Sequence, residues 1–493
     1  MAELAAVAAC VGVFLVNAAP TYASVVDDAY ISARYASQLA AGNGLAYNAV
    51  GPAVEGYTNL AFVLLLAVGE ALGAPMPDLA VHLGATFGAL AVVAAYGAAR
   101  ALGAAASGDP ATPAPGALVA AFLLASSPHF AVTATNGIES SLYVLTVLCG
   151  AWAAAVAPVP VAAGLAAVAP VVRPEGAVVG GLFALVVAAR ARDGRPLVPV
   201  VLVVAALTAW RWVTYGALVP NTLAAKSARS LADQIAFNLE YLRPERAFWA
   251  LAAVTLVCAP VYLRPTFGRV GLWVAGAFTV ALAMRVDMWM PGGRLLMPAF
   301  AAACVLVGLA VDDGGWRRGI GVVGAIGLLT ASLAHGGVAR AYDRAHTVQP
   351  GNPAERAART IAARVRGEWV ATRDAGVLAY WVGPHNHVAE LHERALTQPH
   401  PGGAPLDLAS VPPNPGIVVV TAARAKATGF RYPNDRTVLE SLTVPYTYLG
   451  RVYQHRHRYY DVYARDDLGL EPFPDALVEN RAGLAPKKGE RPF

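Results

Sequence analysis

Long apolar segments separated by short polar ones recur along the first two thirds of the chain. These runs are long enough to cross, or nearly cross, a bilayer as helices, and they are rich in Ala, Gly and Val, which suits closely packed membrane helices. The pattern predicts a mainly α-helical, polytopic membrane bundle of about eleven to thirteen transmembrane helices. The runs lie near residues 4–23, 57–73, 78–103, 116–135, 139–157, 159–171, 174–190, 197–215, 248–263, 270–284, 295–311 and 319–335.

Composition supports a membrane protein and excludes a soluble one. The chain is 57% hydrophobic and only 14% charged, whereas soluble domains are about 25% charged. The net charge is +5. No cluster of basic residues interspersed with aromatic ones occurs before the tail, so the sequence indicates no nucleic-acid partner. The four cysteines lie in apolar runs without a C-x-x-C motif, which favours packing roles over metal binding or disulfides.

Basic loops predict the orientation of the bundle, because Lys and Arg are enriched on the cytoplasmic side. The basic clusters are Arg190, Arg192 and Arg195, then Arg264 and Arg269, then Arg317 and Arg318. They place the first loop (24–57), the loops 216–247 and 285–294, and the tail outside the cytoplasm. An outside tail and an inside N-terminus require an odd number of crossings, whereas the runs are even in number. Either 159–171 or 174–190 is re-entrant, or another helix is split or missed.

The composition changes near Gly336, after which no apolar run of membrane length occurs. We therefore expect a transmembrane domain over residues 1–335 and a small extracytoplasmic α/β domain over residues 336–493. The pattern predicts a helix over Asn352 to Arg366 and β-strands over residues 368–372, 416–421, 446–453 and 459–464.

Two adjacent carboxylates, Asp27 and Asp28, follow the first apolar run directly. Such a pair at the membrane surface suits general-base or metal chemistry. The same residues are also good N-caps for a helix over residues 29–41. Residue types alone leave both interpretations open.

Further charges interrupt the apolar pattern at the expected outer side. The cations are Arg34, Arg173, Lys226 and Arg294, and the anions are Glu55 and Glu175. A site with both signs suits a lipid-phosphate substrate, because the cations can hold phosphate while a carboxylate takes a proton from a hydroxyl. Each cation taken singly is better explained by snorkelling to lipid headgroups, and it is the occurrence of three cations in separate outer loops that favours a site. Glu139 and Asp287 are interpreted as helix caps or members of local ion pairs.

Five segments together resemble the GT-C superfamily of membrane glycosyltransferases, most nearly the terminal arabinofuranosyltransferases of mycobacterial cell-wall arabinan. They occur in the family's order. The segments are DDAYISARYASQLAAGNGLAYN with VEGYTN (27–59), RPEG (173–176), YGALVPNTLAAK (215–226), MPGGRLLMP (290–298) and DAGVLAYWVG (374–383). Two features depart from the family: the tail is smaller, and Arg285-Val286-Asp287 replaces a Gly-Gly-Asp-like motif.

The resemblance implies that a sugar, with arabinofuranose as the first candidate, passes from a polyprenyl-phosphate donor to a glycan or glycolipid acceptor outside an inner or plasma membrane. It implies a catalytic carboxylate at Asp28 or Asp27. We expect Lys226, Arg294 and Arg173 at the donor phosphate. The sugar or acceptor would contact Glu55, Tyr57, Asn59, Asn221 and Glu175. The resemblance identifies no particular cofactor, and a divalent cation on Asp27 and Asp28 stays open.

A transporter or flippase for a lipid-linked or anionic substrate is the main rival from another class. It would also use outward-facing cations and interrupted helices. Inverted repeats between two halves of the chain would favour it, and the sequence contains no detectable repeat of that kind. A non-catalytic sugar-binding protein on the same fold is a third interpretation, and it predicts that the first-loop carboxylates are dispensable.

Overall fold

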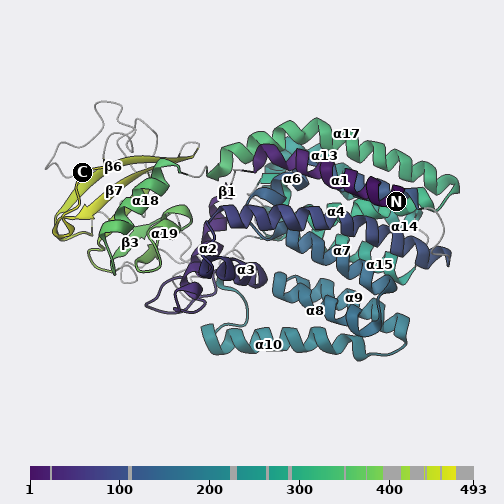
Figure 1. Cartoon of the computed structure of the whole chain (residues 1–493), viewed down its shortest axis with the longest axis horizontal. Coiled ribbons are helices and arrows are strands. Elements are labelled where there is room, and N and C mark those ends of the chain that lie inside the picture. The colour runs from purple at the N-terminus through teal and green to yellow at the C-terminus, as the bar shows by residue number, and fades with distance from the viewer. Residues whose placement is uncertain are drawn as a thin grey trace.

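A computed structural model describes most of the chain. The described residues are 1–22, 25–108, 114–222, 230–262, 266–286, 291–348, 351–373, 375–391, 412–421, 438, 441–455 and 458–473. Their helices form an elongated bundle, and a small sheet lies at one end of it (Figure 1). We call residues 351–473 the C-terminal sheet region.

The bundle is built from helices that follow the apolar runs. Its α-helices are α1 (Ala2–Ala18), α2 (Asp27–Ala40), α3 (Leu60–Ala71), α4 (Asp78–Ser107), α5 (Pro115–Ala125), α6 (Pro128–Thr135), α7 (Ser140–Val156), α8 (Val159–Val172), α9 (Gly176–Ala191), α10 (Val198–Tyr215), α12 (Leu231–Tyr241), α13 (Arg246–Val257), α14 (Ala259–Tyr262), α15 (Phe267–Ala283), α16 (Met297–Asp312) and α17 (Gly315–His346). Short 3₁₀ turns are η1 (Ala19–Thr21), η2 (Arg195–Leu197), η3 (Arg243–Glu245) and η4 (Pro291–Leu296).

Helix length and hydropathy identify a multi-pass membrane protein. Within the described ranges, 5 segments are long and apolar enough to span a bilayer, or up to 6 if the bent pair α5–α6 counts as one span. Shorter apolar helices of 10–17 residues accompany them, among them α3, α7, α8, α9 and α15. The predicted fold class, a mainly α-helical membrane bundle with a small α/β region, is confirmed. The total number of crossings stays a prediction.

The apolar run 116–135 is two helices rather than one. α5 and α6 meet at an angle of 60°. Ser127 caps α6 by accepting a hydrogen bond from the Phe130 amide at 3.3 Å, and Pro128 at the first helical position has no N–H to continue α5. The bend follows from this Ser-Pro pair.

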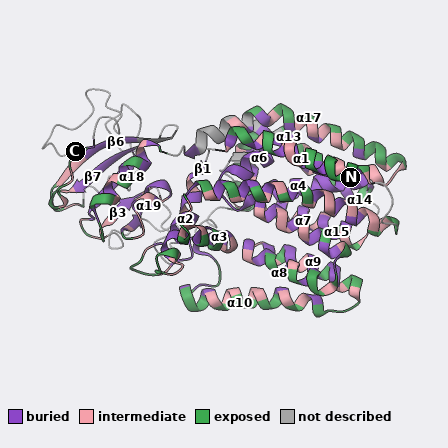
Figure 2. Ribbon diagram, in the orientation of Figure 1, coloured by how far each residue is buried: buried purple, intermediate pink, exposed green. Residues whose placement is uncertain are grey.

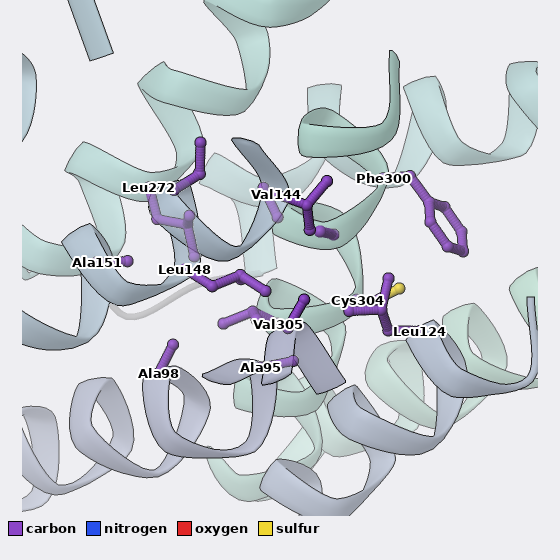
Figure 3. Packing of buried hydrophobic residues seen from close by; sticks show 14 of the residues in the cluster. Ala95, Ala98, Leu124, Val144, Leu148, Ala151, Leu272, Phe300, Cys304 and Val305 are labelled. Carbon is purple, nitrogen blue, oxygen red and sulfur yellow. The ribbon is translucent and has the colours of Figure 1, made fainter. Parts of the chain in front are cut away.

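α16 is the central helix of the bundle. Every residue from Met297 to Ala310 is buried, and Figure 3 shows Phe300, Cys304 and Val305 packed among side chains of neighbouring helices. Where α5 crosses α16, a Cβ on either Gly116 or Gly308 would overlap the other's backbone. Glycine at both positions therefore allows the two helices to approach at backbone distance, as small residues do in membrane bundles.

α10, by contrast, lies at the edge of the bundle with an exposed surface (Figure 2). Its side chains Val201, Leu202 and Val213 are 61%, 63% and 83% exposed. Apolar exposure of this extent in a membrane protein fits contact with lipid rather than water.

The bundle and the sheet region are joined close to the start of α2. Strand β1 (Val25–Val26) pairs antiparallel with β2 (Thr347–Val348), with Val25 opposite Val348. The end of α17 therefore lies beside the first residues of α2. α17 continues through residue 335 to His346, and the division of the chain into domains at 335/336 stays a prediction.

The C-terminal sheet has the strand order β4-β3-β5-β7-β6. β3 is parallel to both β4 and β5, while β5–β7 and β6–β7 are antiparallel. The elements are α18 (Pro353–Arg364), β3 (Trp369–Thr372), α19 (Val377–Trp381), β4 (His387–Glu390), β5 (Ile417–Thr421), β6 (Tyr446–His455), β7 (Arg458–Arg465) and η6 (Asp466–Leu468). The predicted helix and strands are confirmed as α18, β3, β5, β6 and β7, whereas the short α19 and β4 were not predicted.

One apolar core connects the sheet region with α2 and α3. It contains Tyr30 and Tyr35 from α2, Phe62 and Leu66 from α3, and Leu378 from α19. α2 thus packs on both the membrane bundle and the C-terminal sheet region.

Candidate functional site

Polar side chains gather where several helices of the bundle begin or end. We call these residues the helix-end cluster. Asp28 and Ser32 come from α2, Asn59 precedes α3, Glu139 precedes α7, and Arg173 and Glu175 lie between α8 and α9. Arg294 comes from η4, just before α16. Charges are tolerated at such positions because helix ends leave backbone groups unsatisfied and polar surroundings accumulate there.

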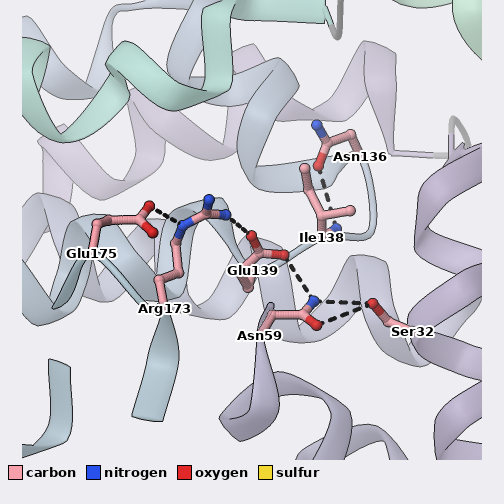
Figure 4. Close-up of polar contacts among 7 residues, drawn as sticks. All are labelled: Ser32, Asn59, Asn136, Ile138, Glu139, Arg173 and Glu175. Atoms are coloured by element: carbon pink, nitrogen blue, oxygen red, sulfur yellow. Dashed lines mark hydrogen bonds and ion pairs between the residues drawn. The ribbon is translucent and has the colours of Figure 1, made fainter. Parts of the chain in front are cut away.

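Glu139 is the centre of this cluster (Figure 4). Its carboxylate is 3% exposed, accepts a hydrogen bond from Asn59 Nδ2 at 2.9 Å and forms an ion pair with Arg173. Asn59 also donates to Ser32 Oγ at 3.0 Å. Four segments distant in sequence are therefore linked through one buried carboxylate.

Arg173 is held between two carboxylates. Its guanidinium contacts Glu139 on one side and Glu175 on the other, and it lies 5.9 Å from the ring centroid of Tyr143. Two anions largely neutralise this cation. The structure thus places Arg173 in the expected cluster, but with protein partners already bound to it.

Arg294 has a different environment. It experiences electrostatic attraction to Asp28, Glu139 and Glu175, and repulsion from Arg173. No hydrogen bond joins its guanidinium to another residue in the part of the chain that the structure describes. The N–H donors of Arg294 are therefore better suited than those of Arg173 to bind an incoming anion.

The adjacent carboxylates Asp27 and Asp28 have different partners. Asp27 Oδ1 accepts a hydrogen bond from the Val377 amide of α19 at 3.0 Å, whereas Asp28 attracts Arg294. Both lie in the first turn of α2, whose N-cap residue is Val26 and makes no side-chain cap bond. The prediction that Asp27 or Asp28 is the N-cap of the following helix is wrong, because α2 already begins at Asp27 with Val26 as its N-cap; Asp27 instead binds the first amide of α19.

Glu55, Tyr57 and Asn221 attach the first loop to α10. Arg211 Nε of α10 donates to both Glu55 oxygens, at 3.0 and 2.8 Å. The hydroxyls of Tyr57 and Tyr215 are 3.1 Å apart, and the Asn221 amide donates to the Glu55 carbonyl at 3.0 Å. Burial raises the pKa of Glu55, and the neighbouring Arg211 opposes that rise. These contacts give the three residues a structural role besides the sugar-binding one expected of them.

Arg34 does not serve as a free cation for phosphate. It is 1% exposed, and its guanidinium donates to the carbonyls of Tyr47 at 2.8 Å, Asn386 at 2.8 Å and Ala379. Carbonyl oxygens of the C-terminal sheet region therefore satisfy this charge. The earlier expectation that it adds to a phosphate site is replaced by a role in joining α2 to that region.

Sequence reasoning missed two residues that the structure makes prominent. Glu139 was interpreted as a cap or local pair, yet its partner Arg173 is 34 residues away. Arg211 was passed over between Trp210 and Trp212, although it is the single charged residue of the run 198–215. An isolated charge in an apolar run is the signal that identifies both.

Some expected residues lie outside the described ranges. Lys226 and Asp287 are among them. Within the described ranges, no three His, Cys, Asp or Glu side chains form a group that could hold a metal ion. The divalent cation on Asp27 and Asp28 stays an untested expectation.

Comparison with known proteins identifies the fold. No family model matches the chain, and no curated protein matches it in sequence. The crystal structure of ArnT from Cupriavidus metallidurans in the apo state superposes with a TM-score of 0.59 at 14% identity, covering 94% of this chain and 98% of ArnT. ArnT from the same organism bound to undecaprenyl phosphate gives 0.57 at 16% identity, covering 93% and 97%.

A third structure, the cryo-EM structure of arabinofuranosyltransferase AftD from Mycobacteria, has a TM-score of 0.49 at 15% identity and covers 94% of this chain and 42% of AftD. That likeness is too weak to carry an argument. ArnT is a GT-C glycosyltransferase, so the resemblance to the GT-C superfamily is confirmed for the fold. Identities this low establish the fold alone.

Proposed function

We propose that this protein is a membrane glycosyltransferase that transfers a sugar from a polyprenyl-phosphate carrier to a glycan or glycolipid acceptor. The observation that carries the proposal is that the helix-end cluster brings the carboxylate of Asp28 close enough to Arg294 for the two charges to attract each other. Proton removal requires a carboxylate and phosphate stabilisation a cation, and the guanidinium of Arg294 makes no hydrogen bond within the described part of the chain. The ArnT fold and the undecaprenyl phosphate bound to one ArnT structure support a polyprenyl carrier.

Asp28 acts as the general base in this proposal. It takes the proton from an acceptor hydroxyl, and the oxygen attacks the anomeric carbon of the donor sugar. The bond from that carbon to the phosphate oxygen breaks, and its electron pair stays on the departing polyprenyl phosphate. A positioned base of this kind contributes about 10²–10⁴ in rate.

Arg294 stabilises the negative charge that develops on the departing phosphate. Charge-assisted hydrogen bonds from a guanidinium are strongest where the site excludes water. Lys226 is the second cation that we assign to the phosphate, on the basis of the sequence motif. Arg173 assists less directly, because Glu139 and Glu175 already bind it.

Asn59 and Glu175 are the residues of the cluster that we assign to the sugar or acceptor. Asn59 is held by Glu139 and Ser32, so its side-chain orientation is fixed before any ligand binds. Glu55, Tyr57 and Asn221 would complete the subsite through the first loop that they attach to α10. Prior ordering of this kind lowers the entropy cost of binding.

The proposed location is an inner or plasma membrane, with the helix-end cluster and residues 336–493 outside the cytoplasm. The basic clusters of the sequence support this orientation. A C-terminal extracytoplasmic domain beside the cluster would lie on the acceptor's side of the membrane. Arabinofuranose is the first donor sugar to test, on the strength of the sequence motifs.

The test uses purified protein in detergent with radiolabelled decaprenyl-phosphate-arabinose and a short arabinan acceptor. Sugar transfer by the wild type, with stoichiometric release of decaprenyl phosphate, supports the proposal. Donor binding without release, across a panel of sugar and glycolipid acceptors, would instead support the transporter. A parallel panel of undecaprenyl-phosphate sugars separates a wrong donor from a wrong reaction.

A further inference from the structure

The contact between Asp27 and α19 connects the C-terminal sheet region to the start of α2, the helix that carries the proposed base Asp28. Asp27 Oδ1 accepts from the Val377 amide at 3.0 Å, across 350 residues of sequence. Asp28, the next residue, lies close enough to Arg294 for their charges to attract each other. Any shift of the first turn of α2 therefore moves the proposed base relative to the proposed phosphate cation.

Gly376 leaves room for this contact. A Cβ at this position would overlap the carboxyl group of Asp27. The absence of a side chain at Gly376 therefore allows the close approach of α19 to Asp27.

The middle of α2 is held by the same segment of the C-terminal sheet region. Arg34 donates to the carbonyls of Ala379, Gly383 and Asn386. Tyr30, which lies between Asp27 and Arg34 on α2, packs at 5.9 Å from Tyr380 of α19. α19 and the turn after it therefore hold α2 at its first turn and two turns later.

We propose that α19 is a positioning element of the catalytic site, so that Asp27 and Asp28 have separate roles: Asp27 positions α2 through Val377 and Gly376, and Asp28 performs the chemistry. The proposal rests on the proposed function for the chemical role of Asp28. It assigns the C-terminal sheet region a catalytic contribution that does not depend on acceptor binding. Misplacement of a catalytic group by about 1 Å costs up to about a hundredfold in rate.

The first experiment compares Asp27→Asn with Asp27→Ala by release of decaprenyl phosphate. The Asn side chain keeps an oxygen that accepts from Val377, but it cannot act as a base or as an anionic metal ligand. We expect Asp27→Asn to retain at least about half of kcat, whereas Asp27→Ala loses about tenfold with the donor KM unchanged within about twofold. Equal losses in the two variants would overturn the positioning role.

A second comparison uses Gly376→Ala alone and together with Asp27→Ala. The added Cβ displaces the Asp27 carboxyl in the wild-type background but has no carboxyl to meet in the double variant. The losses are therefore expected to be non-additive, as for residues in contact. Additive losses would contradict the proposal. Gly337→Ala is the matched control, because that helical glycine has open space around its Cβ position.

Hydrogen exchange of the peptide spanning residues 375–383 gives a readout that needs no turnover. Asp27→Ala is expected to raise its exchange at least about tenfold, and Asp28→Asn to leave it unchanged. If the wild type transfers no sugar from any donor, the proposed function fails, while this measurement still tests the contact. Unchanged exchange in Asp27→Ala would show that the contact does not hold α19, and the inference would fail.

Discussion

Glu139 and Arg173 form a buried ion pair although they are 34 residues apart in sequence. The pair joins the start of α7 to the end of α8. Arg173 also forms an ion pair with Glu175 at the start of α9. Asn59 connects Glu139 to α3. One guanidinium therefore determines how three helix ends and the first loop are arranged around the proposed site.

Removing this guanidinium leaves the buried carboxylate of Glu139 and the half-buried carboxylate of Glu175 without their cation. Arg173→Met is expected to destabilise the protein by about 3–5 kcal/mol, because breaking a buried pair leaves uncompensated charge. Arg173→Lys is expected to be intermediate, since an ammonium lacks the fork that reaches both partners. Thermal unfolding in detergent measures the effect. An unchanged Tm in Arg173→Met would show that the pair does not organise these helix ends.

The second prediction concerns Arg211, whose ion pair with Glu55 attaches the first loop to α10. Arg211→Met leaves the Glu55 carboxylate, which is 2% exposed, without its ion-pair partner. We expect faster hydrogen exchange in residues 45–57, and partial recovery when Glu55→Gln removes the charge as well. Trp212→Phe is the control, because Trp212 is 60% exposed on the same helix. Equal exchange in Arg211→Met and the control would argue against the attachment.

Arg294 is predicted to act on the donor phosphate. Arg294→Ala removes charge-assisted hydrogen bonds worth about 1.5–3 kcal/mol, so the donor Kd is expected to rise about tenfold or more. Arg294→Lys keeps the charge and is expected to lose less. Arg285→Ala is a matched control at an exposed position. Titration of radiolabelled donor measures both, and an unchanged Kd in Arg294→Ala would remove Arg294 from the phosphate site.

We expect the stability of the C-terminal sheet region to depend on pH through the titration of His387. Burial, with the charge of Arg34 nearby, lowers the pKa of His387 below its usual 6.5. The folded state therefore resists protonation, and the stability present above pH 6.5 is lost as the pH falls below that value. The drop in Tm between pH 7.5 and 5 is expected to shrink in His387→Gln. His385→Gln, at an exposed position, is the control; an equal drop in both variants would contradict the assignment.

Periodicity explains why so much of the fold could be predicted. Apolar runs of membrane length reveal the helices of the bundle, and short β-branched and aromatic runs reveal β3, β5, β6 and β7. The five residues of α19 are too few to establish a helical period, and β4 begins with His387 and ends with Glu390, so it lacks the β-branched and aromatic run that marks β3. Ser127 and Pro128 are the residues that indicate the bend between α5 and α6. The bend was not predicted because the apolar run continues through both helices.

The site was only partly predictable, because tertiary partners decide what each charge does. Asp28, Arg173, Glu175, Asn59 and Arg294 were expected together and the structure brings them together. Arg34 has the residue type of a phosphate ligand, yet carbonyls more than 340 residues away satisfy it. Asp27 and Asp28 are equivalent in sequence, and the structure distinguishes them by the hydrogen bond of Asp27 with the Val377 amide and by the electrostatic attraction between Asp28 and Arg294.

Donor binding and donor turnover in Asp28→Asn test the central claim most directly. The Asn variant keeps the size of the side chain and removes the base. We predict that it binds radiolabelled decaprenyl-phosphate-arabinose with a Kd within about threefold of wild type, while release of decaprenyl phosphate to acceptor falls by about a hundredfold or more. Release at the wild-type rate would contradict a catalytic role for Asp28 and, with it, the proposed mechanism.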